Sequence, residues 1–137
     1  MGRQTVKITA DTNVLVRATT QDDARQSGIA REVLARAEMV VLTLEALCEF
    51  VWVLSRGYKI PASEIAEGIR VLIDGANVVT NRLAVEAGLA ALDAGGDFAD
   101  GVIAFEGAWL GAETFVSFDK KAVSLLKAQG TATRLLS

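Results

Sequence analysis

The chain has 137 residues, 51% hydrophobic and 23% charged, the balance of a globular domain able to bury about two-thirds of its unfolded surface. Its net charge of −3 argues against a general nucleic-acid coat, yet it permits an enzyme with a local basic rim. With no histidine and only Cys48, the chain lacks a histidine-based triad and an internal disulfide, and we expect a buried, reduced thiol.

Short β-branched or apolar runs alternate with helical patterns along the whole chain, which predicts a single domain over residues 1–137. Strands are expected at residues 5–10, 39–42, 76–79, 114–118 and 131–136. Helices are expected at 14–18, after Asp22 or Asp23, from the N-cap at residue 43 to residue 56, from 61 onward, at 82–93, at 97–110 and after Asp119.

Local chemistry adds detail to three of these helices. The apolar spacing of the second helix turns Ile29, Val33 and Leu34 towards the core. Thr43 is placed to cap the third helix, and Pro61 suits the first helical position of the fourth.

Strands that alternate with helices predict an α/β protein, with an α/β/α sandwich around a mostly parallel sheet. Ligands bind such sheets at the carboxyl ends of the strands. Asp11 and Asp119 directly follow strands and fall at that edge. Glu49 lies two turns into the helix after the second strand, and Asp100 lies in the first turn of its helix. We therefore expect these four acids to share one crevice.

Each acid also has a structural interpretation. Asp11 and Asp119 are placed to cap helices, and the spacing of Asp97 and Asp100 is close to that of a capping box. For Asp97 in particular, the sequence does not decide between the role of a metal ligand and that of a helix cap.

Glu49 is the most informative of the acids because its helix is apolar on nearly every side. A lone carboxylate in such surroundings is costly unless a cation satisfies it. Arg56, seven positions on and along the same face, is the candidate structural partner.

Oxygen ligands without histidine or a thiolate cluster select Mg²⁺, or Mn²⁺, over Zn²⁺. Such an ion suits phosphodiester hydrolysis because it polarises the phosphoryl oxygen, generates hydroxide and stabilises the leaving oxygen; one ion, or two about 3.5–4 Å apart, can do this. Asp11 and Asp100 are assigned to metal contact. Glu49 is assigned to the metal or the attacking water, and Asp119 to the second side of the site.

The acids lie in four motifs that together resemble those of PIN-domain ribonucleases, and most of all the VapC toxins of bacterial toxin–antitoxin pairs. In family order they are Ala10–Asn13, Glu49–Leu54 with Arg56–Tyr58, Asp97–Asp100, and Ser117–Lys121. The resemblance covers the chain from about residue 5 to residue 136.

The resemblance implies a Mg²⁺-dependent endoribonuclease with a five-stranded parallel sheet. Its acidic quartet would be Asp11, Glu49, Asp100 and Asp119. The supporting positions would be Thr12, Asn13, Asp97 and Ser117, with Thr12 and Ser117 acting through hydrogen bonds.

The same resemblance implies partners: an RNA substrate such as tRNA or rRNA, an antitoxin that blocks the acidic groove, and a second copy in a homodimer. Gly101 departs from the relatives, which usually carry a residue such as alanine there, and we expect a looser helix start. No apolar run approaches a membrane span, and Asp11 interrupts any signal-peptide core, so we expect a cytoplasmic protein without a membrane partner.

Several other side chains have two interpretations. Cations that either rim the groove and contact RNA phosphates or are solvated surface charge are Arg17, Arg56, Lys59, Lys120 and Lys121. Trp52 and Trp109 either stack bases or, as we expect from their apolar helices, pack in the core or a dimer interface. Residues that suit the core or a subunit interface are Leu83, Val85, Leu89 and Leu92.

Two rival functions stay open. A phosphoacceptor regulatory domain would also have an acidic Mg²⁺ pocket, but it would need a phosphorylatable aspartate closing a central strand, where this chain has the helical Glu49. A catalytically silent binding protein would use its acids only as helix caps.

Overall fold

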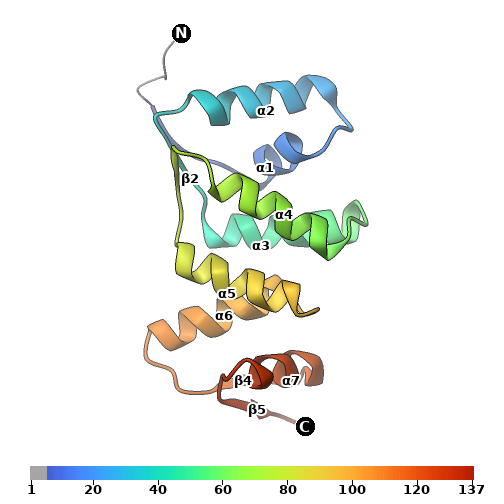
Figure 1. Ribbon diagram of the computed structural model, residues 1–137, viewed down its shortest axis with the longest axis vertical. Coiled ribbons are helices and arrows are strands. Elements are labelled where there is room, and N and C mark those ends of the chain that lie inside the picture. Colours follow the sequence, from blue (N-terminus) through green and yellow to red (C-terminus); the bar gives the residue numbers. More distant parts are fainter. Residues whose placement is uncertain (1–5) are drawn as a thin grey trace. The chain divides into compact units, whose positions relative to one another are not determined.

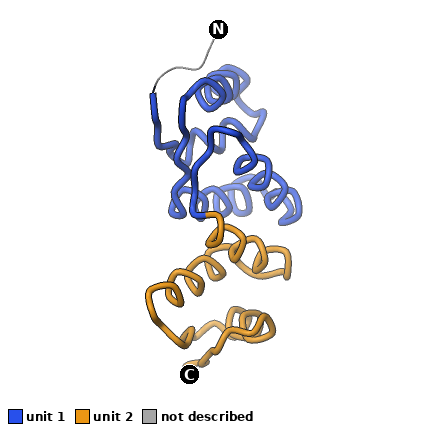
Figure 2. Tube along the Cα trace, turned by 60° about the vertical axis from the view of Figure 1, so that its left-hand side comes forward, with its two compact units in different colours: residues 1–81 blue, residues 82–137 orange. Residues whose placement is uncertain are grey.

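A computed structural model describes residues 6–137, so Thr5 at the start of the first predicted strand lies outside the described residues (Figure 1). The chain divides into two compact units, residues 1–81 and residues 82–137 (Figure 2). Each unit has its own helices and its own small parallel sheet.

The first unit holds a three-stranded parallel sheet in the order β1-β2-β3. Its strands are β1 (Lys7–Thr9), β2 (Met39–Val41) and β3 (Val78–Val79). Its helices are α1 (Thr12–Thr19), α2 (Ala24–Arg36), α3 (Leu44–Trp52), the π-helical turn η1 (Val53–Gly57) and α4 (Ala62–Ile73). Helix α1 packs against both α2 and α3.

The second unit begins with two helices that pack closely on one another, α5 (Arg82–Asp93) and α6 (Phe98–Trp109). Strand β4 (Phe115–Ser117) then leads to α7 (Lys120–Ala128) and to β5 (Thr133–Leu135). The two strands pair in parallel, with Ser117 opposite Leu135.

The prediction of an α/β protein with parallel strands is confirmed, and every predicted strand is present within the described residues. The strands occur as a sheet of three and a sheet of two. The joining of all five into one sheet, and of both units into one domain, stays a prediction.

The connection from strand to helix has the same form after four of the strands. The second residue beyond each strand is polar and immediately precedes a helix: Asp11, Thr43, Asn81 and Asp119. Parallel strands need such crossover helices, and a polar residue at the turn can satisfy the free amides of the first helical turn. The expected caps Thr43, Asp97 and Asp119 each accept a hydrogen bond from a backbone amide.

Two predictions about the second helix are wrong. Ile29 and Val33 are 51% and 45% exposed, whereas Ser27 and Ala30 face the interior. Periodicity identified the helix but not which of its faces packs on α1, and this face carries small residues. Within the described residues, Ser27 Oγ is a buried atom without a hydrogen-bond partner.

Other predictions need smaller corrections. Pro61 lies at the N-cap of α4, one residue before the predicted position, with an extended ψ of 148°. Cys48 is only half-buried. The prediction that the tryptophans pack in the core is wrong, because Trp52 and Trp109 are 64% and 77% exposed.

The four residues predicted for the core or a subunit interface differ in burial. Val85, Leu89 and Leu92 are buried, whereas Leu83 is exposed. In the part of the chain that the structure describes, no helix has both the length and the apolar character needed to cross a bilayer.

Gly101 has a packing role that differs from the predicted loosening of the helix start. A Cβ at this position would overlap the backbone carbonyl oxygen of Ala87 and crowd the Cβ of Ala91, both on α5. Glycine therefore lets α5 and α6 approach closely, and it sits directly after Asp100.

Gly101→Ala should lower the free energy of unfolding by about 1–3 kcal/mol, because backbone atoms must move to admit the methyl group. Thermal or urea unfolding measures the change. Gly28→Ala is the matched control: it lies in α2 with open space around it, so alanine should stabilise the helix by about 0.5–1 kcal/mol. Equal effects of the two substitutions would contradict the close approach of α5 and α6.

Candidate functional site

Asp11 stands at the exposed end of β1, at the N-cap position of α1. Its side chain makes no capping hydrogen bond, so the carboxylate is not used by the helix that it precedes. Thr12, the first residue of α1, is buried, while Asn13 is exposed. The arrangement leaves the Asp11 oxygens open to a ligand.

Glu49 lies on α3 in a stripe of exposed residues, while Leu47, Phe50 and Val51 on the other faces are buried. The carboxylate therefore reaches solvent, and the expected cost of an acid enclosed by apolar side chains does not arise. No ion pair joins Glu49 to Arg56 in the described part of the chain. The structural partner predicted for Glu49 is thus absent from these residues.

The π-helical turn η1 explains the missing pair. The backbone amide of Tyr58 bonds to the carbonyl of Val53, five residues back, rather than four. This wider turn rotates Arg56 off the face that it would share with Glu49 in a regular α-helix. Both side chains remain exposed.

Three acids of the second unit lie near enough for their charges to interact. Asp97 caps α6 by accepting a bond from the amide of Ala99 at 3.1 Å. Asp119 caps α7, and its Oδ1 accepts from the amides of Lys121 and Ala122 at 2.9 and 3.2 Å. Asp100, in the first turn of α6, feels the charges of both Asp97 and Asp119.

We call Asp97, Asp100 and Asp119 the acidic cluster. Of the three, Asp100 is the one whose ionised form is disfavoured by its surroundings. Burial chiefly, and then the neighbouring charges of Asp97 and Asp119, raise the pKa of its carboxyl above the usual 3.8. Within the described residues, no hydrogen bond or ion pair to its side chain relieves this cost. A bound cation would remove both the repulsion and the need for a proton.

Ser117 supports the cluster through the backbone. Its hydroxyl oxygen accepts a hydrogen bond from the amide of Asp119 at 2.9 Å, which fixes the chain where it leaves β4. The predicted support by Ser117 therefore takes the form of a contact with the backbone of Asp119, not with its carboxylate.

The donor atoms suit a hard cation, since carboxylate oxygens are the ligands that Mg²⁺ prefers. Within either unit, among residues 6–137, no three acidic or thiol side chains are grouped closely enough to hold a metal ion. Asp11 and Glu49 belong to the first unit and the acidic cluster to the second. The convergence of the two groups stays a prediction.

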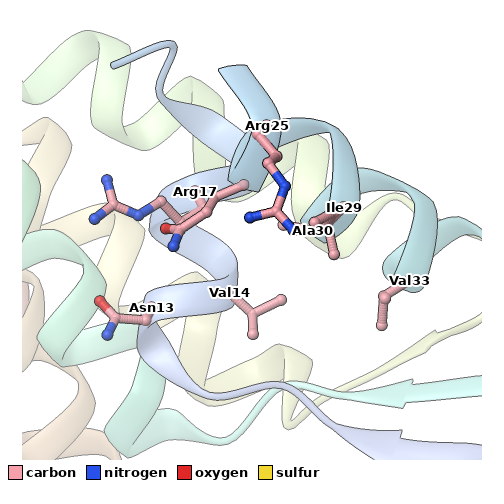
Figure 3. A pocket seen from close by; sticks show the side chains of 8 residues that line it. Asn13, Val14, Arg17, Arg25, Ile29, Ala30 and Val33 are labelled. Atoms are coloured by element: carbon pink, nitrogen blue, oxygen red, sulfur yellow. The ribbon is translucent and has the colours of Figure 1, made fainter. Parts of the chain in front are cut away.

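A groove of about 530 Å³ lies between α1 and α2 in the first unit (Figure 3). Asn13, Arg17 and Arg25 give it polar and cationic walls, while Ile29 and Val33 supply an exposed aliphatic face. The side chains wrongly assigned to the core are therefore groove-lining residues. The groove reaches Asn13, two residues beyond Asp11.

One polar network was not predicted. Tyr58 donates a 2.8 Å hydrogen bond to Asp22, which also accepts from Thr20 and pairs with Arg17. The hydrogen bond from Tyr58, followed by that from Thr20, lowers the pKa of the Asp22 carboxyl. The network ties the end of η1 to the loop between α1 and α2; the 36-residue separation of Asp22 and Tyr58 leaves no local sequence signal.

Asp100→Asn should raise the free energy of unfolding at neutral pH, because it removes a carboxylate that is disfavoured in the folded state. The raised folded-state pKa means that the folded protein binds this proton more tightly than the unfolded chain does. Stability from this group is therefore present at low pH and is lost as the pH rises from the ordinary value of 3.8 through the raised value.

Urea unfolding between pH 3 and pH 7, roughly the range in which carboxyls titrate, measures this difference. The gain from Asp100→Asn should vanish at the acidic end. Glu106→Gln is the matched control, an exposed acid near the other end of α6, and it should leave the pH profile unchanged. A neutral-pH loss of stability in Asp100→Asn would show that the carboxylate is not under strain.

Comparison with known proteins identifies the family. No curated protein matches the chain in sequence. The profile of the PIN domain matches residues 8–126, which includes every strand-end and helix acid described above. PIN domains are generally metal-dependent nucleases that typically use Mg²⁺. The chain therefore belongs to the PIN domain family.

Proposed function

We propose that this PIN domain is a Mg²⁺-dependent endoribonuclease that acts as the toxin of a VapBC-type pair. The observation that carries the proposal is the acidic cluster, in which the half-buried Asp100 is held beside two further carboxylates without a cation of the chain to balance it. A protein that used its acids only as caps would not need Asp100, which caps no helix. Nothing observed favours the phosphoacceptor function.

The proposal requires both units to form one domain, in which Asp11 and Glu49 meet the acidic cluster. Two observations support this arrangement. The family profile matches residues 8–126, a range that includes parts of both units. Asp11 and Asp119 also occupy equivalent positions, two residues beyond the ends of parallel strands.

The residues divide the work as follows. Asp11 and Asp100 would hold the ion, because their carboxylates have no competing hydrogen bonds in the described structure. Glu49, exposed and unpaired there, would hold the ion or orient the attacking water. Asp119, fixed by the amides of α7 and by Ser117, would complete the second side. A bound Mg²⁺ supplies Lewis acidity at the scissile phosphate and acidifies the water.

RNA cleavage should require Mg²⁺ or Mn²⁺, and it should fall by more than about one-hundredfold in Asp11→Asn or Glu49→Gln. The estimate is a lower bound, since even residues that only support metal ligands cost about 10–100-fold when changed. A gel assay on total cellular RNA, followed by sequencing of the new ends, measures cleavage and finds the substrate among tRNA and rRNA.

Both variants should keep the wild-type melting temperature within a few degrees, because each side chain is exposed and makes no recorded bond in the described residues. Glu45→Gln, one turn before Glu49 on the same exposed stripe, is the matched control and should cleave normally. Cleavage that persists in excess EDTA would exclude the metal mechanism. Stable uptake of phosphate from a small phosphodonor, without cleavage, would favour the phosphoacceptor function instead.

We also propose that the antitoxin binds the groove between α1 and α2. An exposed aliphatic face beside Arg17 and Arg25 suits an amphipathic segment with acidic residues. Because Asn13 lines the groove and is two residues from Asp11, an occupant that extends past Asn13 would block access to Asp11. A homodimer is proposed as well, supported by exposed apolar side chains on α6 such as Ile103 and Trp109.

Ile29→Asp should weaken the complex with the antitoxin by at least about tenfold, since it puts a charge on the aliphatic face of the groove. Co-expression with the small protein encoded in the adjacent reading frame, followed by size-exclusion chromatography and calorimetry, measures the loss. Val71→Asp on α4 is the control, because Val71 is an even more exposed aliphatic residue outside the groove. Equal loss in both variants would place the antitoxin elsewhere.

A further inference from the structure

Helix α3 exposes Glu45, Glu49 and Trp52 to solvent along one stripe. The turn η1, which follows, exposes Ser55 and Arg56. Trp52 is the single large apolar residue among them and is 64% exposed. In the described residues its indole makes no recorded hydrogen bond or ring contact.

The position of Trp52 relates it to the proposed catalytic acid. It follows Glu49 by three residues on α3, and side chains three apart are neighbours on one helix face, one turn along. An indole that stands beside a carboxylate and faces solvent is open to contact with a group from outside the chain.

The chain beyond Trp52 is held in an unusual conformation. The π-helical turn begins at the next residue, and single π turns are frequent at functional sites. Lys59 follows with a φ of 56°, a conformation that costs a residue other than glycine about 1 kcal/mol or more. The 2.8 Å hydrogen bond from Tyr58 to Asp22 anchors this segment to the loop between α1 and α2.

We propose that Trp52 stacks on a base of the RNA next to the scissile phosphate, and that Arg56 binds a neighbouring phosphate. The inference rests on the proposed ribonuclease function. Indoles stack on any base, and a guanidinium binds phosphate in a fixed geometry. Arg56 is exposed and has no ion pair in the described structure, so it is available for this contact.

The neighbours of Trp52 favour RNA over a protein partner. A protein interface centres on contiguous apolar surface, whereas the other exposed residues of this stripe are polar or charged. Trp109 shows the contrast, since it lies beside the exposed Leu110 and on the same helix as the exposed Ile103. Trp52 and Trp109 are the two tryptophans of the chain, so each can be observed separately.

The first experiment measures fluorescence in an Asp100→Asn background, which should stop cleavage under the proposed function. With Trp109→Phe added, Trp52 is the sole tryptophan, and a short single-stranded RNA should quench its emission. With Trp52→Phe added instead, the same RNA should leave the emission of Trp109 unchanged. Anisotropy of a labelled RNA reports binding independently in both proteins.

The second experiment measures cleavage. Trp52→Ala should lower kcat/KM by about ten- to one-hundredfold, the usual effect of losing one base stack. Trp52→Tyr should restore most of the activity, because it keeps an aromatic face, and all variants should melt like the wild type. Val71→Ala, which truncates an exposed apolar side chain on α4, is the matched control and should cleave normally.

Three results would overturn the inference. RNA that binds without changing Trp52 emission, with normal cleavage by Trp52→Ala, removes the stacking role and leaves the ribonuclease function intact. Loss of a dimer in Trp52→Ala, seen by light scattering and not reversed by added RNA, assigns the indole to a second copy. Failure of the unaltered protein to bind or cleave RNA overturns the proposed function itself, and the inference with it.

Discussion

The parallel pairing of β1 with β2 is the constraint on which the first unit depends. The register places Thr9 opposite Val41, so Asp11 and Thr43 leave the sheet at the same level of the same edge. Helices α1 and α3 therefore start side by side and pack on one another. This pairing puts a strand-end acid at the start of one helix and Glu49 on the next, without any direct interaction between the two carboxylates.

In the second unit, the capping and metal-binding interpretations of the acids are compatible. Asp97 and Asp119 each use Oδ1 to bind amides at a helix start, which leaves Oδ2 without a recorded bond in the described residues. The positive ends of α6 and α7 also make the crowding of negative charge less costly. Asp100 carries the remaining cost, as its raised pKa shows. The caps thus fix two carboxylates in place, and the third has no hydrogen bond or ion pair within the described residues.

The sequence predicted those features that depend on local chemistry. The strands, the helices and the caps at Thr43, Asp97 and Asp119 follow from alternation and from residues that bind free amides. It failed where the answer depends on which face of a helix finds a neighbour. Ile29 and Val33 have the spacing of core residues but line a groove, because α1 meets the small residues of α2 instead. The role of Gly101 was likewise hidden, since nothing local indicates that the carbonyl of Ala87 lies against it.

The π-helical turn bears on the structural alternative for Glu49, a salt bridge to Arg56. In a regular α-helix, Arg56 would lie seven residues beyond Glu49 and within about 20° of its face. A salt bridge there would neutralise Glu49 and occupy the guanidinium. The wider turn at Val53–Gly57 separates the two charges and leaves both exposed. The carboxylate is thereby free for the proposed metal pocket and the guanidinium for the substrate, so a local departure from α-helical geometry keeps both groups available.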